Sequence, residues 1–290
     1  MYAALAANLA ITITKFIAAA VSGSAALFSE GIHSVVDTGD SALLLLGLVL
    51  SKRAATREHP YGQGLQVYFW TLVVAMCIFG MGGGISIYEG ILHVVAPHEI
   101  QAIGWAYAVL AAAFVFEGFS WFVSVRGFRR SRGKLGVWEG IKRSKDPTTF
   151  VVVLEDSAAL MGIAIAALGL SASHFWGIAI ADGLASIVIG ALLVVVAVVL
   201  GRETWSLLLG EAATPELVHS IRDMARTQPG IVDAHLPRTM HFGPEAVHVD
   251  LEVEVDPGMR ASELVETVNE LEAKVRERHP VVHRLQVRFV

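Results

Sequence analysis

Six long apolar stretches constrain the fold of this 290-residue chain more than any other feature. They cover approximately residues 2–21, 25–50, 67–94, 103–125, 148–170 and 176–200. A helix needs roughly 20 mostly apolar residues to cross the hydrocarbon core of a bilayer. Because 54% of the residues are hydrophobic, only 17% are charged and the mean hydropathy is +0.58, the composition does not fit an ordinary soluble domain. The sequence therefore predicts an α-helical membrane protein with six transmembrane helices.

The distribution of lysine and arginine predicts how these helices are oriented. Loops rich in these residues stay on the cytoplasmic side of a membrane. The connection between the second and third stretches carries Lys52, Arg53 and Arg57. The connection between the fourth and fifth carries Arg126, Arg129, Arg130, Arg132, Lys134, Lys142, Arg143 and Lys145, whereas the other three connections have no lysine or arginine. Both termini are therefore expected in the cytoplasm, with a bacterial inner or plasma membrane as the expected location.

Several other classes of protein fit the composition poorly. The single cysteine, Cys77, excludes a disulfide framework and a cysteine-based zinc site within one chain. With a net charge of -5 and no basic domain, no nucleic-acid partner is expected. The first apolar stretch lacks the features of a cleaved leader, so no signal peptide is expected. No His-Glu-x-x-His motif or nucleophile elbow is present, so a membrane protease ranks low and no enzyme activity is expected.

The composition changes after Arg202, which predicts a transport domain over 1–202 and a second domain over 203–290. Thr214 and Pro215 are typical of the start of a helix. A strand is expected over 231–241, and the alternation of apolar and polar residues over 247–255 predicts a second strand with one solvated face. The expected elements are a helix from 215, these two strands, a helix around 264–275 and a strand over 284–290. This order is typical of a small α+β domain with helices on one face of a sheet.

A polar stripe crosses the second apolar stretch. Glu30, His33, Asp37 and Asp40 are spaced by three, four and three residues, so they share one face of a helix. Ionisable groups at membrane depth are costly and indicate function by default. His33 and Asp37 are one turn apart and can bind one small divalent cation, with zinc favoured over calcium or magnesium. The fifth stretch offers adjacent acids that would complete such a site, Glu155 and Asp156.

A purely structural role is the alternative, in which these groups form an interhelical hydrogen-bonded network. Acids outnumber cations within the spans, since Lys15 is the obvious partner for Glu30, Asp37, Asp40, Glu117, Glu155, Asp156 and Asp182. This imbalance favours a bound cation or bound protons over a network alone. Lys15 is expected to pair with one of the acids. For Glu117 and Asp182, a packing role and a proton-relay role both stay open.

Several motifs resemble those of the cation diffusion facilitator family of divalent metal transporters, in particular its divergent zinc-transporter subgroup. They are Asn8 with Lys15, the segment from Ser24 to Asp37, the loop from His59 to Gly64, Glu155-Asp156-Ser157 and Ala181-Asp182-Gly183. The resemblance implies six membrane helices, a ferredoxin-like cytoplasmic domain and a homodimer. It also implies efflux of a divalent cation, most commonly Zn²⁺, in exchange for protons.

The family site carries over to His33, Asp37 and Asp156, with the metal as the transported substrate. Where zinc-selective members usually have a fourth ligand, a histidine, this chain has Val152, so Glu155 is the expected substitute. The metal ligands predicted from the resemblance are therefore His33, Asp37, Asp156 and Glu155. Selectivity for Mn²⁺, Fe²⁺ or Co²⁺, and a membrane sensor or scaffold that binds metal without translocating it, are the alternatives.

Two further family sites are eroded in this chain. In the loop from His59 to Gly64 the second histidine is replaced by Gln63, so a structural turn is expected there. In the C-terminal domain, His235 and Asp250 occupy positions that resemble family ligands, but the last ligand pair is missing. Scattered histidines could add to a surface site there, namely His219, His241, His248, His279 and His283. The expected role of this domain is dimerisation.

Overall fold

The computed structural model describes residues 2–97, 99–133 and 135–290, with side chains described except at 2–8, 131, 142 and 149. The chain forms two compact units. One contains Met1–Gly47 and Phe69–Thr204, and the other contains Leu48–Tyr68 and Trp205–Val290. The short connection between the second and third membrane helices thus belongs to the same unit as the C-terminal domain.

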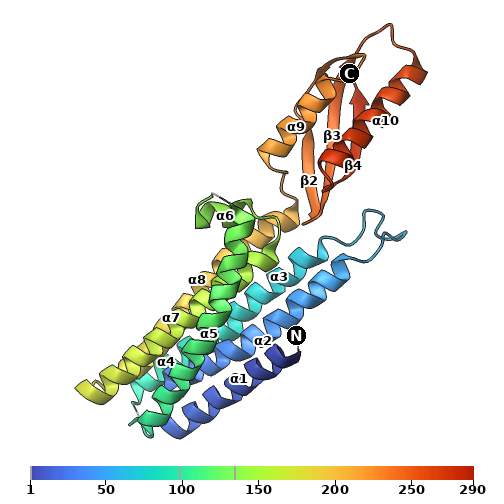
Figure 1. Ribbon diagram of the computed structural model, residues 1–290. Coiled ribbons are helices and arrows are strands. Elements are labelled where there is room, and N and C mark those ends of the chain that lie inside the picture. Colours follow the sequence, from blue (N-terminus) through green and yellow to red (C-terminus); the bar gives the residue numbers. More distant parts are fainter. Residues whose placement is uncertain (1, 98, 134) are drawn as a thin grey trace. The chain divides into compact units, whose positions relative to one another are not determined.

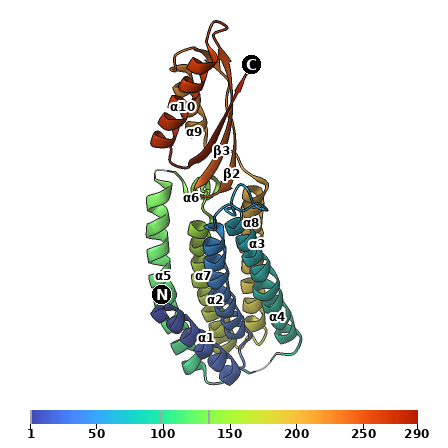
Figure 2. The same ribbon diagram turned by 90° about the vertical axis from the view of Figure 1, so that its right-hand side faces the viewer.

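The first unit is a bundle of long helices that pack side by side (Figure 1, Figure 2). Its helices are α1 (Tyr2–Ser22), α2 (Ala25–Ser51), α3 (Gln66–Cys77), the π-helix η1 (Ile78–Gly84), α4 (Ile85–Val95), α5 (Ile103–Arg132), α6 (Val137–Arg143), α7 (Pro147–Trp176) and α8 (Ala181–Leu209). Among the described residues, five helical segments are long and apolar enough to cross a membrane, with α3, η1 and α4 forming one of them. The sixth apolar helix is α1, whose described side chains begin at Leu9. The predicted six-helix membrane fold is confirmed, and the short helix α6 was not expected.

Local sequence signals define where several of these helices begin and end. At the start of α7, the Asp146 side chain accepts a hydrogen bond from the Thr148 backbone N–H at 3.0 Å, and Pro147 occupies the first turn. Acidic caps and an early proline are favourable there because the first N–H groups of a helix have no internal partner. The same helix ends at Gly177, which adopts a positive φ of 63°. Glycine tolerates this left-handed conformation without a steric penalty.

Glycines bring the third span close to α8. A Cβ atom at Gly90 would lie 2.7 Å from the carbonyl oxygen of Gly183, and one at Gly83 would lie 3.0 Å from that of Gly190. Small residues permit this backbone approach between membrane helices, where van der Waals packing drives association. Gly83 lies in η1, and π-helical turns inside an α-helix frequently mark functional segments.

The C-terminal domain contains two helices and a mixed sheet. Its elements are α9 (Pro215–Arg226), β1 (Ile231–Ala234), β2 (Arg238–Gly243), β3 (Ala246–Val255), α10 (Ala261–Arg278) and β4 (Val282–Phe289). The central strand β3 pairs antiparallel with β1 and β2 along one edge and parallel with β4 along the other. The helices cover one face of this sheet (Figure 2). The predicted α+β domain is confirmed.

Alternation along β3 separates the core from solvent as the sequence predicted. Val247, Val249, Leu251 and Val253 are buried beside residues from α9 and α10. The expectation of one continuous strand over 231–241 was wrong, because β1 and β2 are separated by residues 235–237. Pro237 lies in this break, and a proline cannot donate a hydrogen bond to a neighbouring strand.

Candidate metal site in the membrane unit

Lys15 of α1 is fully buried and connects three helices. Its Nζ atom donates to Glu30 Oε2 at 3.1 Å and to Ser34 Oγ at 2.8 Å, both on α2. The same atom lies 3.8 Å from Oε1 of Glu117 on α5. The expectation that Lys15 pairs with an intramembrane acid is therefore confirmed. The contacts of Glu30 agree with the alternative of a structural network between helices.

Asp182 caps the start of α2. Its Oδ1 accepts a hydrogen bond from Ser24 Oγ at 2.5 Å, and its Oδ2 accepts from the backbone N–H groups of Ala25 at 2.5 Å and Ala26 at 3.4 Å. These N–H groups begin a helix and have no partner inside it. A carboxylate also interacts favourably with the positive end of the helix dipole. Of the two roles considered for Asp182, these contacts support the packing role.

Three of the predicted ligands are His33 and Asp37 on α2 and Asp156 on α7. His33 and Asp156 are 5% and 6% exposed, so both are held inside the bundle. Asp37 and Asp156 are close enough for their carboxylates to repel each other. Among the described residues, Nε2 of His33 has no hydrogen-bond partner. A buried imidazole nitrogen without a partner is unfavourable and is suited to accept a metal ion.

Asp40 and Glu155 form a second contact between the same two helices. Both side chains are buried, and their carboxyl groups interact with each other. Two buried carboxylates that lie close together repel each other, which favours the binding of a proton or a cation. Glu155 also interacts electrostatically with Asp37 and Asp156. The sequence did not predict that Glu155 interacts with Asp40.

Among the described residues, the four predicted ligands do not form one coordination sphere. Within residues 2–97, 99–133 and 135–290, no group of three or more histidine, cysteine, aspartate or glutamate side chains is arranged to hold a metal ion. Val152, one turn before Asp156, is 36% exposed and has no donor atom. The ligand set His33, Asp37, Asp156 and Glu155 therefore stays a prediction, and binding would require the side chains of α2 and α7 to approach further.

Two serines of α5 support the site, and sequence reasoning missed them. Ser124 donates a hydrogen bond to Oδ2 of Asp156 at 2.7 Å, and Ser120 lies 3.3 Å from each of the two carboxylate oxygens. These bonds orient the carboxylate that the sequence predicted as a ligand. The only signal in the sequence was the four-residue spacing of two small polar residues in an apolar helix, which places them on one face.

The C-terminal positions that resemble family ligands make other contacts. His235 Nε2 lies 3.6 Å from a carboxylate oxygen of Glu254. Asp250 lies 3.7 Å from the guanidinium of Arg288, which also hydrogen-bonds Glu252 at 3.2 Å. Arginine therefore neutralises the acids of this sheet face. The contacts of His235 and Asp250 do not point to a metal site.

The helical bundle and its buried carboxyl groups define a multi-span integral membrane protein with a polar site inside the membrane. The cation efflux transmembrane domain matches residues 1–209, and the cytoplasmic domain of cation efflux proteins matches residues 213–287. Together these matches cover nearly the whole chain. The chain belongs to the cation efflux family, as its motifs predicted.

Individual relatives support the same assignment. The chain is 35% identical over 244 residues to the mitochondrial proton-coupled zinc antiporter SLC30A9 of Mus musculus, a match that covers 83% of this chain and 43% of the mouse protein. It is 30% identical over 258 residues to metal tolerance protein C4 of Arabidopsis thaliana, covering 88% of this chain and 56% of that protein. A probable cation efflux system protein of Mycobacterium tuberculosis is 26% identical over 286 residues, with 93% and 80% covered. The chain thus spans about half the length of the mouse and plant relatives or less.

Proposed function

We propose that this protein exports a divalent metal ion, most favourably Zn²⁺, from the cytoplasm in exchange for protons. The observation that carries the proposal is the cluster of Asp37, Asp40, Glu155 and Asp156 between α2 and α7. Within the described residues, none of these four carboxyl groups forms an ion pair with lysine or arginine. Buried negative charge without a counter-charge is strongly unfavourable, so the cluster requires protons or a metal cation.

Exchange at one site follows from the chemistry of these ligands. A carboxylate or imidazole binds metal only in its deprotonated form, so metal binding releases protons and proton binding releases metal. We expect the neighbouring carboxyl groups of Asp40 and Glu155 to hold a proton that an arriving cation would displace. Competition between the two kinds of cation is sufficient for antiport when the site opens alternately to the two sides of the membrane.

The ligand types support zinc as the substrate, with other transition metals as the alternative. One imidazole and several carboxylates suit Zn²⁺, while a site with a single histidine discriminates less well against Mn²⁺, Fe²⁺ or Co²⁺. Val152 contributes no second histidine. The name of the mouse relative also favours zinc and protons.

The proposal extends to the organisation of the protein. Residues 1–202 act as the transport domain and 203–290 as a cytoplasmic domain, with both termini in the cytoplasm. We propose a homodimer in the lipid bilayer, since the C-terminal region matches the cytoplasmic domain of cation efflux proteins. The membrane itself is a separate prediction, because the sequence favours a bacterial inner membrane while the mouse relative is mitochondrial.

Metal flux into inverted proteoliposomes with an imposed proton gradient tests the proposal. We expect Zn²⁺ uptake that depends on the gradient and that His33→Ala and Asp37→Ala abolish. Glu89→Gln in α4 is the matched control, since it changes an acid of a membrane helix outside the cluster, and it should retain flux. Wild-type flux in both site variants would refute the assigned site. Metal binding without any flux in the unsubstituted protein would instead support the sensor or scaffold.

A further inference from the structure

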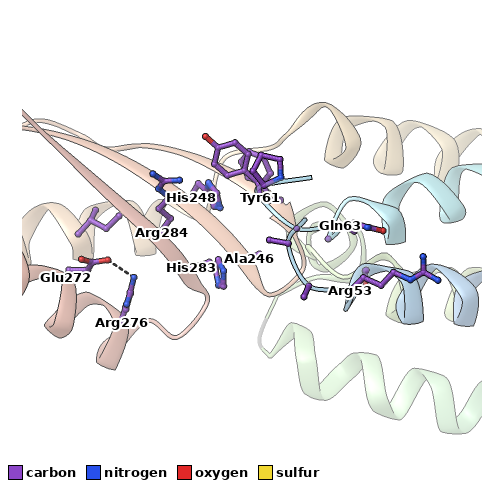
Figure 3. A pocket seen from close by; sticks show the side chains of 17 residues that line it. Arg53, Tyr61, Gln63, Ala246, His248, Glu272, Arg276, His283 and Arg284 are labelled. Carbon is purple, nitrogen blue, oxygen red and sulfur yellow. Dashed lines mark hydrogen bonds and ion pairs between the residues drawn. The ribbon is translucent and has the colours of Figure 1, made fainter. Parts of the chain in front are cut away.

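A cavity in the second compact unit lies outside the candidate metal site. Its volume is about 610 Å³, and it is bounded by the loop after α2, by β2, β3 and β4, and by α10 (Figure 3). A second cavity of about 290 Å³ shares Tyr61, Phe242, His248 and Arg284 with the first. The larger volume falls within the range of small-molecule sites, roughly 300–1,000 Å³.

The loop that forms one wall of this cavity is packed against the sheet. The Tyr61 ring lies 5.4 Å from that of Phe242 and 5.1 Å from that of His248, measured between centroids. Gly64 approaches the backbone of Phe242 so closely that a Cβ atom would collide with its carbonyl oxygen. Gly62 has a positive φ of 83° and donates its N–H to the His59 carbonyl at 3.0 Å. These contacts agree with the structural turn expected from the sequence and make the loop a fixed wall.

The cavity has an excess of positive charge. Its lining includes three arginines, Arg53, Arg276 and Arg284, but only one acid, Glu272. This acid already forms an ion pair, because the Glu272 carboxylate lies 2.6 Å from the Arg276 guanidinium. Within the described part of the chain, Arg284 forms no ion pair. Its guanidinium carbon lies 5.7 Å from the centre of the Tyr61 ring. Arg284 therefore keeps its hydrogen-bond donors available.

The other end of the same sheet face shows the opposite arrangement. Arg288, four residues along β4 from Arg284, contacts Asp250 at 3.7 Å and Glu252 at 3.2 Å. One arginine of the strand is thus neutralised by protein acids, while the other faces a cavity without a free acid. Arg288 is consequently a matched control for Arg284.

Two histidines, His248 and His283, also line the cavity. The rings of His248 and His283 are nearly parallel, with centroids 6.5 Å apart. Burial, together with the neighbouring His283 and Arg284, lowers the pKa of His248 from its usual value. An anion in the cavity would reverse the electrostatic part of this effect, since opposite charge favours a protonated imidazole.

We propose that this cavity binds a phosphate-bearing anion, held by Arg284 with His248 and His283. The planar guanidinium of arginine donates two parallel hydrogen bonds to phosphate oxygens, and charge-assisted bonds of this kind are the strong ones. The anion is either a soluble phosphate compound or the phosphorylated headgroup of a lipid. Because the loop wall begins directly after α2, the helix that contains His33 and Asp37, an anion bound here restrains the cytoplasmic end of that helix.

Binding measurements on the full-length protein test this inference. Isothermal titration calorimetry with pyrophosphate, on protein in nanodiscs of phosphatidylcholine, measures the soluble source. Native mass spectrometry of protein taken from vesicles of phosphatidylcholine with a phosphoinositide measures the lipid source. Arg284→Gln should weaken binding by about tenfold or more, as expected for the loss of a hydrogen bond between charged groups. Arg284→Lys should retain part of the binding, and Arg288→Gln should retain all of it.

Each outcome decides the inference. Pyrophosphate binding that is lost in Arg284→Gln but not in Arg288→Gln supports a soluble anion. Phosphoinositide that is lost in Arg284→Gln but stays bound in Arg288→Gln, in a protein that does not bind pyrophosphate, supports a lipid headgroup. If neither ligand binds, or if Arg284→Gln and Arg288→Gln weaken binding equally, the inference is refuted. A His248→Gln variant that leaves the affinity of the bound ligand unchanged refutes the histidine's role, and none of these results depends on metal flux.

Discussion

Removal of the Lys15 ammonium group should destabilise the membrane unit strongly. Lys15→Met keeps most of the side-chain volume but eliminates the bonds to Glu30 at 3.1 Å and Ser34 at 2.8 Å. Both Lys15 and Glu30 are fully buried, so the remaining carboxylate has no access to solvent. Removal of one partner from a buried ion pair costs about 3–5 kcal/mol, mainly because the other charge stays behind.

A second substitution separates this charge effect from a loss of packing. Glu30→Gln removes the orphaned charge, so the double variant Lys15→Met with Glu30→Gln should be more stable than Lys15→Met alone. The measurement is the apparent melting temperature in detergent, where about 3–5 kcal/mol corresponds to a fall of roughly 6–20 °C for a unit of this size. Lys52→Met, in the loop after α2, is the matched control and should leave the melting temperature unchanged. If Lys15→Met melts like the unsubstituted protein, or if the double variant is the least stable of the three, the reasoning is wrong.

Two further predictions concern helix packing and pH. Gly90→Ala should destabilise the bundle by about 1–3 kcal/mol, because its Cβ atom would meet the Gly183 backbone at 2.7 Å. Gly80→Ala is the control, since a Cβ atom there meets nothing within 4 Å. Equal melting temperatures of the two variants would contradict the close approach of Gly90 to Gly183. Burial and Arg278 lower the pKa of His279 below its usual 6.5, so the unfolded state binds more protons and stability falls as the pH drops below about 6.5. Thermal melts of the full-length protein from pH 7.5 to 5 should therefore show a smaller acid-induced loss in His279→Gln, and an unchanged pH profile would refute this assignment.

The sequence by itself determined the membrane fold, since it depends on properties that are local in the chain. Apolar stretches of about 20 residues form membrane-spanning helices whatever their neighbours, because each helix satisfies its own backbone hydrogen bonds. The alternation over 247–255 likewise identified β3 and its buried face, because the two-residue period of a strand is a local property. The break between β1 and β2 was missed because a polar and apolar pattern continues across Pro237.

Only the tertiary structure decided what each intramembrane acid contacts. Glu30 and Asp40 lie on the same helical stripe, yet Glu30 forms an ion pair with Lys15 whereas Asp40 interacts with another acid, Glu155. Asp182 caps the start of α2 from a position 157 residues away along the chain. The physical reason is that helical spacing determines which side chains share a face, while the approach of other helices determines which partners that face receives. The stripe could therefore be predicted from the sequence. Its division into a structural ion pair and a candidate site for metal and protons could be seen only in the tertiary structure.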